Sequence, residues 1–130
     1  MNSRSIALRS FIAFLLMTEG QPLWAAWDRV YETKTAVHYI DPETVQKNGH
    51  LRRVSTLQDL RQQGDRGELS MRALMEYDCD QKRVRVISAT AHRGQMATRE
   101  IVSRVSSPAQ WISIAPESAF NTTLRFVCTQ

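Results

Sequence analysis

Long apolar runs are absent from this sequence. Its 130 residues contain no stretch of about 18 apolar residues, so an ordinary membrane-spanning helix is not expected. Five glycines and four prolines are too few for a fibrous repeat, and 42% hydrophobic with 23% charged residues excludes a disordered chain. The length suits one domain, because a second core would need roughly 100 residues of its own.

Signature motifs of enzymes are also missing. The sequence has no GxSxG nucleophile elbow and no SxxK pair, and its two cysteines form no CxxC motif. Ser70, Ser118, Asp59 and Asp78 are therefore isolated candidates for a hydrolase site and form no recognisable set. We expect a protein that is not an enzyme and holds no cofactor.

The three histidines are far apart along the chain. His38, His50 and His92 share no metal-ligand spacing such as HxxxH, and two cysteines cannot form a four-thiolate site. We expect packed or exposed histidines and no metal. A haem or metal site that uses one of them, with a methionine as axial partner, is the alternative.

Positive charge comes mainly from arginine and is scattered. Seventeen lysine and arginine residues stand against 13 acidic ones, with short clusters only at 52–53 and 82–85. Nucleic acid binding needs a continuous basic face, so a nucleic acid partner is not expected. Five aromatic residues are expected mainly in the core, with a binding surface as the alternative. They are Trp27, Tyr31, Tyr39, Tyr77 and Trp111.

The first 25 residues have the layout of a secretory signal peptide. Arg4 and Arg9 precede a short apolar run at 11–17, and a polar stretch then leads to the small residues Ala25 and Ala26. The run is too short to span a membrane, and no cysteine follows it as a lipid anchor. We expect cleavage after Ala25, or after Ala26, and a domain of residues 26–130 that is exported to the periplasm or the cell surface.

Short strands separated by turn residues are expected beyond the signal peptide. Alternating polarity and β-branched or aromatic residues predict six of them, at 27–33, 36–40, 50–60, 70–79, 82–92 and 97–105. The segment 50–60 is ambiguous, because its apolar residues also recur every three positions, as in a helix. Consecutive strands with short turns predict an antiparallel meander.

The clearest of these strands is 70–79. Its odd-numbered residues are apolar, which predicts that they face the core. Glu76 and Asp78 share the other face, which we expect to be solvated, with Arg83 and Arg85 of the next strand as charge partners. Such pairing leaves little room for acid–base chemistry by the two carboxylates.

A helix is expected near the C-terminus. Pro116 and Glu117 suit its first turn, and positions 120, 124, 127 and 128 fall on one face. Cys128 lies with this apolar stripe and Cys79 with the apolar face of its strand, so a helix laid across the sheet would bring both thiols together. An even number of cysteines in an exported chain usually indicates a disulfide, and we predict the bond Cys79–Cys128. The fold class expected is α+β, a six-stranded antiparallel meander with the helix tied on one face.

Several segments resemble the surface-adhesin protein E-like family and occur in the order seen there. They are Trp27-Asp28-Arg29-Val30, Tyr39-Ile40-Asp41-Pro42, Glu76-Tyr77-Asp78-Cys79, Lys82-Arg83-Val84-Arg85, Trp111 followed by Pro116-Glu117-Ser118, and Val127-Cys128. The resemblance covers 27–128, implies the fold predicted above and makes 50–60 a strand. It also implies a bacterial surface adhesin that binds host matrix and serum proteins and can dimerise, and haem binding is attributed to the family.

Three features depart from the family pattern. Ser55 stands where the family usually has tryptophan, the turn 95–99 lacks the glycines common near Met96, and no lipid-anchor cysteine is present. A periplasmic location is therefore expected as much as display on the cell surface, and the motifs transfer no binding residue.

The function expected is a non-enzymatic module that binds an unknown protein partner. Its arginine-rich strand faces would contact an acidic surface on a host or envelope protein, and a second copy of the chain is a candidate partner. The alternative is a periplasmic carrier of a small ligand, such as haem, held between sheet and helix.

Overall fold

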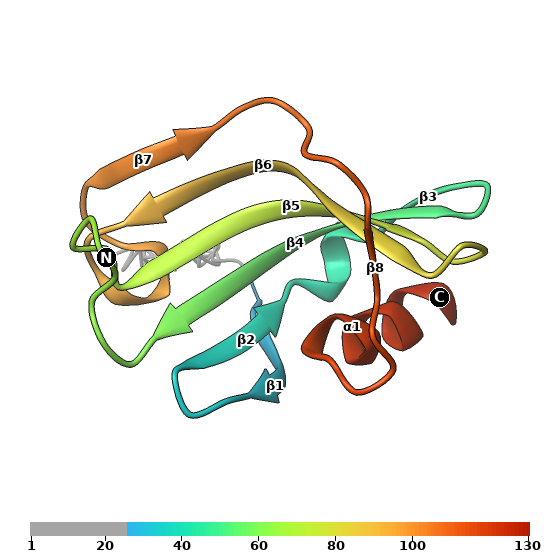
Figure 1. Ribbon diagram of the computed structural model, residues 1–130, viewed down its shortest axis with the longest axis horizontal. Coiled ribbons are helices and arrows are strands. Elements are labelled where there is room, and N and C mark those ends of the chain that lie inside the picture. Colours follow the sequence, from blue (N-terminus) through green and yellow to red (C-terminus); the bar gives the residue numbers. More distant parts are fainter. Residues whose placement is uncertain (1–25) are drawn as a thin grey trace, which may run out of the picture.

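The computed structural model describes residues 26–130, and the predicted signal peptide lies outside them. Six antiparallel strands form the main path of the sheet and follow one another in chain order (Figure 1). They are β1 (Asp28–Glu32), β2 (Ala36–Ile40), β4 (Leu51–Leu60), β5 (Ser70–Asp78), β6 (Arg83–His92) and β7 (Ile101–Val105). The predicted meander is thus confirmed, and 50–60 is a strand.

Two further strands extend the sheet. β3 (Gln46–Asn48) forms a tight hairpin with β4, and β8 (Ile112–Ser113) pairs with the first two residues of β6. Neither was predicted, because three and two residues are too short for polarity to alternate visibly. Two 3-10 turns, η1 (Pro42–Thr44) and η2 (Gln95–Ala97), complete the elements outside the C-terminal helix.

The last of the six predicted strands, β7, begins later than predicted, at Ile101 instead of residue 97. Met96, Ala97 and Arg99 have positive φ angles of 55°, 57° and 64°, so the chain turns tightly there and cannot pair. The amide of Ala97 donates to Ser70 Oγ at 2.9 Å, which ties this turn to the start of β5.

The helix α1 (Ala119–Cys128) also begins later than predicted. Ser118 is the N-cap, and its side chain accepts a hydrogen bond from the Asn121 amide at 3.3 Å. Pro116 lies in the preceding turn, where its carbonyl accepts from Asn121 Nδ2 at 2.7 Å. No helix within residues 26–130 is long and apolar enough to cross a membrane.

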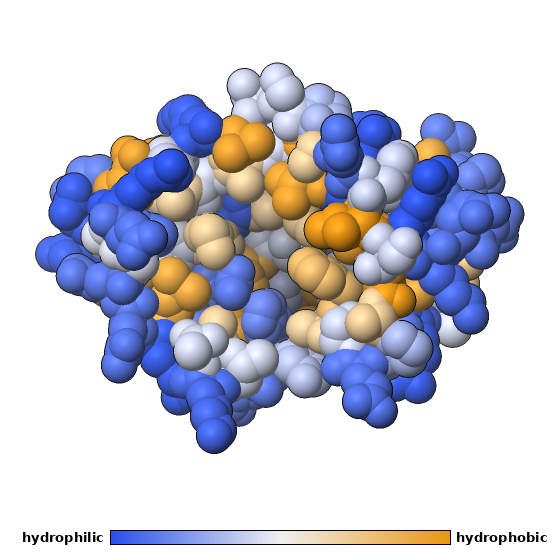
Figure 2. All heavy atoms as spheres, in the orientation of Figure 1, coloured by the Kyte–Doolittle hydropathy of each residue, from blue (hydrophilic) through white to orange (hydrophobic). Residues whose placement is uncertain are grey.

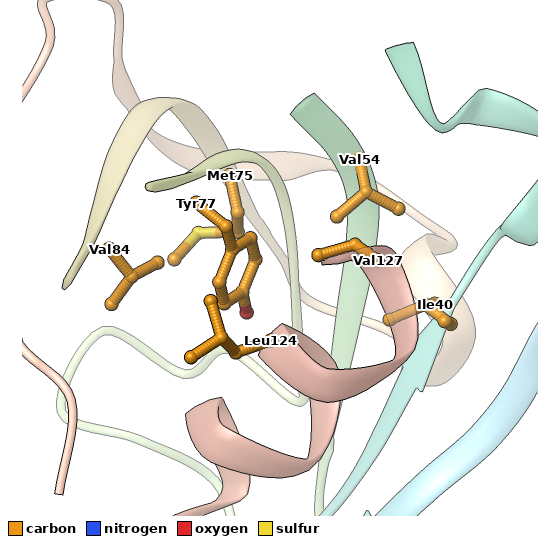
Figure 3. Packing of buried hydrophobic residues seen from close by; sticks show 7 residues of the cluster. All are labelled: Ile40, Val54, Met75, Tyr77, Val84, Leu124 and Val127. Carbon is orange, nitrogen blue, oxygen red and sulfur yellow. The ribbon is translucent and has the colours of Figure 1, made fainter. Parts of the chain in front are cut away.

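The core lies between this helix and one face of the sheet (Figure 3). Leu124 and Val127 point from the helix toward side chains of β2, β4, β5 and β6. The buried sheet residues of this cluster are Ile40, Val54, Met75, Tyr77 and Val84. Phe120, predicted on the apolar stripe, is 40% exposed and lies at the edge of the core.

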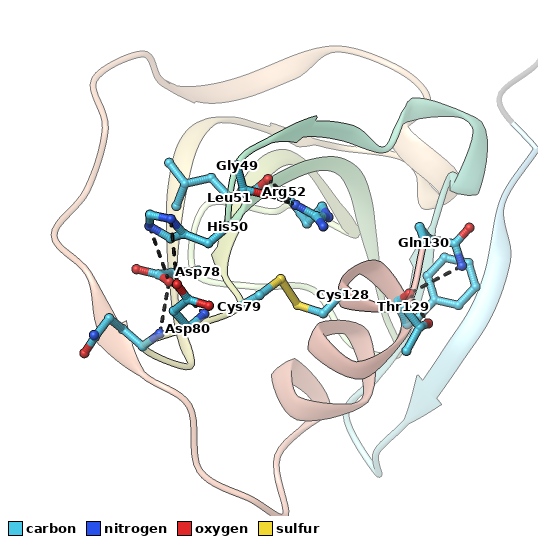
Figure 4. Close-up of a disulfide and its surroundings, with 12 residues drawn as sticks. Gly49, His50, Leu51, Arg52, Asp78, Cys79, Asp80, Cys128, Thr129 and Gln130 are labelled. Carbon is cyan, nitrogen blue, oxygen red and sulfur yellow. Dashed lines mark hydrogen bonds and ion pairs between the residues drawn. A yellow bond between two sulfur atoms is a disulfide. The ribbon is translucent and has the colours of Figure 1, made fainter.

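A disulfide joins the end of the helix to the sheet (Figure 4). Cys79 follows β5 and Cys128 is the last residue of α1, with their Cα atoms 5.8 Å apart. The predicted bond is present. Because it links positions 49 residues apart, it fixes the final element of the fold to the middle of the sheet.

Candidate functional site

A buried charged cluster occupies the sheet face opposite the helix. Glu76 and Asp78 on β5 are 3% and 0% exposed, so the prediction that this face is solvated was wrong. Arg85 on β6, as predicted, and Arg53 on β4, which was not anticipated, both bind Glu76. Arg53 Nε donates to Glu76 Oε2 at 2.7 Å, and Arg85 Nε donates to Glu76 Oε1 at 2.9 Å.

Asp78 is held in a similar way at the end of β5. Its Oδ2 accepts from Arg83 Nε at 2.9 Å, and its Oδ1 accepts from the backbone amides of Asp80 and Gln81 at 3.1 and 3.0 Å. His50 Nε2 lies 3.9 Å from the same carboxylate (Figure 4). The hydrogen bonds fix the turn that leads from β5 into β6.

Both carboxyl groups are stabilised in the ionised form. Burial works to raise the pKa of Glu76, but hydrogen bonds and charge from Arg53 and Arg85 outweigh it and hold that pKa below its usual value. Burial likewise opposes ionisation of Asp78, and the Gln81 amide with the Arg83 side chain lowers its pKa overall. Carboxylates with both oxygens so engaged serve as structural anchors and are poor general acids or bases.

Trp111 covers this cluster from outside. Its ring lies 4.6 Å from the Arg83 guanidinium carbon and 4.5 Å from that of Arg85, a cation–π stack on both arginines. The segment around Trp111 is held in place by the pairing of β8 with β6. This cover explains the burial of Glu76 and Asp78, which alternation along β5 alone could not indicate.

The histidines considered above lie in three different places. His38 on β2 is half-buried, and burial lowers its pKa, which favours the neutral ring. His50 is exposed beside Asp78, and His92, at the end of β6, is buried. Among residues 26–130 no group of three histidine, cysteine or acidic side chains is placed to hold a metal ion.

Of the suggested hydrolase residues, Ser70 and Asp59 are paired across β5 and β4, whereas Ser118 and Asp78 lie elsewhere. Ser70 is buried, donates to the Gly94 carbonyl at 2.5 Å and anchors η2. Asp59 Oδ1 accepts from the Met96 amide at 2.8 Å, on the same turn. Ser118 caps α1. Each of these side chains has a structural partner in the backbone.

Of the five aromatic residues, Tyr77 alone is fully buried, and burial raises its pKa. Trp27 is half-buried and lies 5.6 Å from the guanidinium carbon of Arg72. Tyr31 meets His38 edge to face, with ring centroids 6.1 Å apart. The expectation that these residues lie mainly in the core therefore holds for one of them.

Clefts open on both faces of the sheet. The first lies on the helix side, has a volume of about 270 Å³ and is mostly apolar, with Val30, Met71, Ala73, Val86 and Phe120 in its wall. The face drawn in Figure 2 is hollowed near its middle, with hydrophobic and some hydrophilic residues around the hollow and mostly hydrophilic ones at the margin.

The second cleft measures about 390 Å³, and its wall combines polar side chains with the apolar Ala73, Leu74, Ala89 and Val105. Arg72 and Arg104 line it together with the hydroxyl-bearing residues Ser55, Ser88 and Thr90. No sequence motif indicates this set, because its members are spread over four strands.

The comparisons with known proteins identify the relatives of this fold. A model of the family described as surface-adhesin protein E matches residues 24–129. The chain belongs to this family. A search of curated proteins gave no match.

Solved structures of Haemophilus influenzae protein E share the fold at low sequence identity. Crystal form II is 11% identical, with a TM-score of 0.64 over 82% of this chain and 90% of that one. Protein E from a non-typeable strain is 13% identical, with a TM-score of 0.54 over 82% and 78%. At such identity the likeness supports the arrangement of strands and helix and no individual binding residue.

Haem, which the protein E family resemblance raises, does not fit the apolar cleft. The cleft volume of about 270 Å³ is below the roughly 300–1,000 Å³ typical of pockets for drug-sized ligands. His38, Met71 and Met75 line it, but no arginine or lysine among residues 26–130 does, so the two propionates of a haem would have no cationic partner there. The small-ligand alternative is therefore not supported for haem.

Proposed function

We propose that this member of the surface-adhesin protein E family is an exported, non-enzymatic protein-binding module. Residues 1–25 would be removed as a signal peptide, and the domain of residues 26–130 would act in the periplasm or at the cell surface without a lipid anchor. The observation that carries the proposal is the family match over residues 24–129.

The charged residues of β6 are not the contact surface that the sequence suggested. Arg83 and Arg85 are committed to Glu76, Asp78 and Trp111 within the fold. They would have to break these contacts to meet an acidic partner, so the binding surface is to be sought elsewhere.

The outer edge of β7 is a better surface for a protein partner. It ends the main path of the sheet, and Ile101 and Val105 on it are 38% and 49% exposed. The opposite edge, β1, carries the exposed pair Arg29–Glu32, which discourages strand addition. Although β7 also carries the exposed Arg104, its free edge with Ile101 and Val105 suits a partner that adds an extended segment to the sheet, with backbone hydrogen bonds as the main attraction.

Location is tested by fractionating cells that express the full-length sequence and by treating intact cells with protease. We expect the protein in the envelope with Ala26, or Trp27 for cleavage after Ala26, at its N-terminus. If protease digests the protein on intact cells, the protein is exposed on the surface, and host matrix and serum proteins are the partners to test. If it is protected, periplasmic proteins are the partners to test. A cytosolic protein that retains Met1 would refute export.

Partner binding is tested with the protein immobilised on a sensor surface. Ile101→Lys places a charge on the β7 edge and should weaken capture of the partner at least tenfold. Ile112→Lys on β8 is the matched control, since Ile112 is 56% exposed and lies away from that edge. Equal binding by both variants would remove β7 from the proposal, and self-association lost only in Ile101→Lys would identify the partner as a second copy.

A further inference from the structure

The second cleft, which Arg72 and Arg104 line, lies on the sheet face that is opposite the helix. Arg72 on β5 and Arg104 on β7 both pair with Thr90, from opposite sides of β6. Residues paired across antiparallel strands share a face, so both arginines and Thr90 point the same way. Two strand spacings place the two arginine backbones about 10 Å apart, with the cleft between the side chains.

Both guanidinium groups lack a carboxylate. Within residues 26–130, neither Arg72 nor Arg104 has an acidic oxygen within 4.0 Å, whereas Arg53, Arg83 and Arg85 each have one. No acidic residue of the described chain lines the cleft. Two like charges that face one cleft repel each other, and a bound anion between them would remove that repulsion.

Hydroxyl groups supply further donors. Ser55, Ser88, Thr90 and Ser106 line the cleft beside the arginines. Their oxygens can each donate one hydrogen bond, and a guanidinium presents a planar fork of N–H groups that matches two oxygens of a phosphate or sulfate. The set combines charge and directed donors for a tetrahedral anion.

Two neighbours order this set. The Trp27 ring lies 5.6 Å from the guanidinium carbon of Arg72 and limits its rotation. His92 is 8% exposed, and its Nε2 lies 2.8 Å from Thr90 Oγ1. This hydrogen bond holds the Thr90 side chain in place beside the arginines.

We propose that the cleft between Arg72 and Arg104 binds a tetrahedral oxyanion, the phosphate or sulfate group of a larger ligand. The inference goes beyond the proposed function and does not depend on it, because it concerns a small anionic group and not a protein partner, although Val105 of β7 belongs to both surfaces. Phosphate and sulfate share the geometry that the donors recognise, and the choice of source is left to the experiment.

The test is an NMR titration of the protein produced from the full-length sequence, with inorganic phosphate, inorganic sulfate, glucosamine 6-phosphate and glucosamine 6-sulfate as probes. Ionic strength is kept constant with sodium chloride, so that general screening does not change. We expect saturable shifts of the side-chain Nε resonances of Arg72 and Arg104 and of the Ser88 and Thr90 amides. Tighter binding of one sugar ester identifies phosphate or sulfate as the natural group.

Two variants assign the site. Arg104→Gln removes one fork and should weaken binding about tenfold, the usual effect of one charge-assisted hydrogen-bond pair. Ser55→Trp leaves both charges in place but fills the cleft, and it should abolish the saturable shifts. Arg125→Gln is the matched control, an exposed arginine on α1 that lines no part of the cleft.

Other outcomes would overturn the inference. These are non-saturable shifts spread over all arginines, an equal loss of affinity in Arg125→Gln and Arg104→Gln, or unchanged binding in Ser55→Trp. Each variant is also checked for a wild-type amide spectrum outside the cleft, so that loss of folding is not read as loss of binding.

Discussion

Removing the disulfide should destabilise this protein more than any other single change at its C-terminus. The bond closes a loop between positions 49 residues apart. In the chain-entropy treatment, a loop of this length is worth roughly 4 kcal/mol at 25 °C. For a folded region of 105 residues, from 26 to 130, this corresponds to a fall in Tm of about 15–25 °C.

The assay is urea unfolding of wild type and of the double variant Cys79→Ser/Cys128→Ser, followed by tryptophan fluorescence and far-UV circular dichroism. Replacing both cysteines avoids a free thiol that could form dimers. Wild type in reducing buffer is the control, and its stability should agree with that of the double variant within about 1 kcal/mol if the loop, and not sulfur packing, carries the effect.

Hydrogen exchange locates the loss. Without the bond, α1 is held to the sheet mainly by Leu124 and Val127, so amides of residues 119–128 should exchange faster than those of β5. A loss of stability below about 1 kcal/mol, or helix amides protected as well as the sheet in the double variant, would refute the reasoning.

Three further substitutions test other features. Glu76→Gln should lower the free energy of unfolding by about 1–2 kcal/mol at pH 7. Because the pKa of Glu76 is lowered in the folded state, its contribution to stability is present above the ordinary pKa and is lost as pH falls through the native pKa. Urea unfolding curves of variant and wild type should therefore converge in acid, and a constant difference between them would contradict this. Val127→Ala, at a fully buried site, should lower the free energy of unfolding by about 2 kcal/mol. The control Arg125→Ala, at an exposed site on the same helix, should lower it by less than about 0.5 kcal/mol. Ala97→Gly should raise stability by about 0.5–1 kcal/mol in thermal unfolding, because φ is 57° there and glycine adopts it without strain; an unchanged or lower Tm would count against strain in η2.

The sequence was sufficient for the elements that carry a regular pattern. Alternation along β5 and the 120, 124, 127 and 128 stripe on α1 indicated which faces meet, and together they predicted the disulfide. The two signals agree because both describe the same apolar contact, seen once from the sheet and once from the helix.

Features made by distant residues were not predictable in this way. Charged residues in alternation look solvated, and the burial of Glu76 depends on Arg53 and Trp111, which lie 23 and 35 positions away. The anion cleft needs the register that puts Arg72 and Arg104 on either side of Thr90. The turn at Met96 had a signal in the family pattern, which commonly has glycines there, because glycine adopts positive φ most easily.

The place of α1 after the strands in chain order separates the pairing of the sheet from the covering of its apolar face. Each strand of the main sheet pairs with strands next to it in the sequence, so the meander can form by local pairing. Its apolar face stays uncovered until Leu124 and Val127 pack against it. Until then a nearly complete sheet exposes Ile40 and Val54, and the interval in which the chain can aggregate is set by the docking of α1 and not by strand pairing.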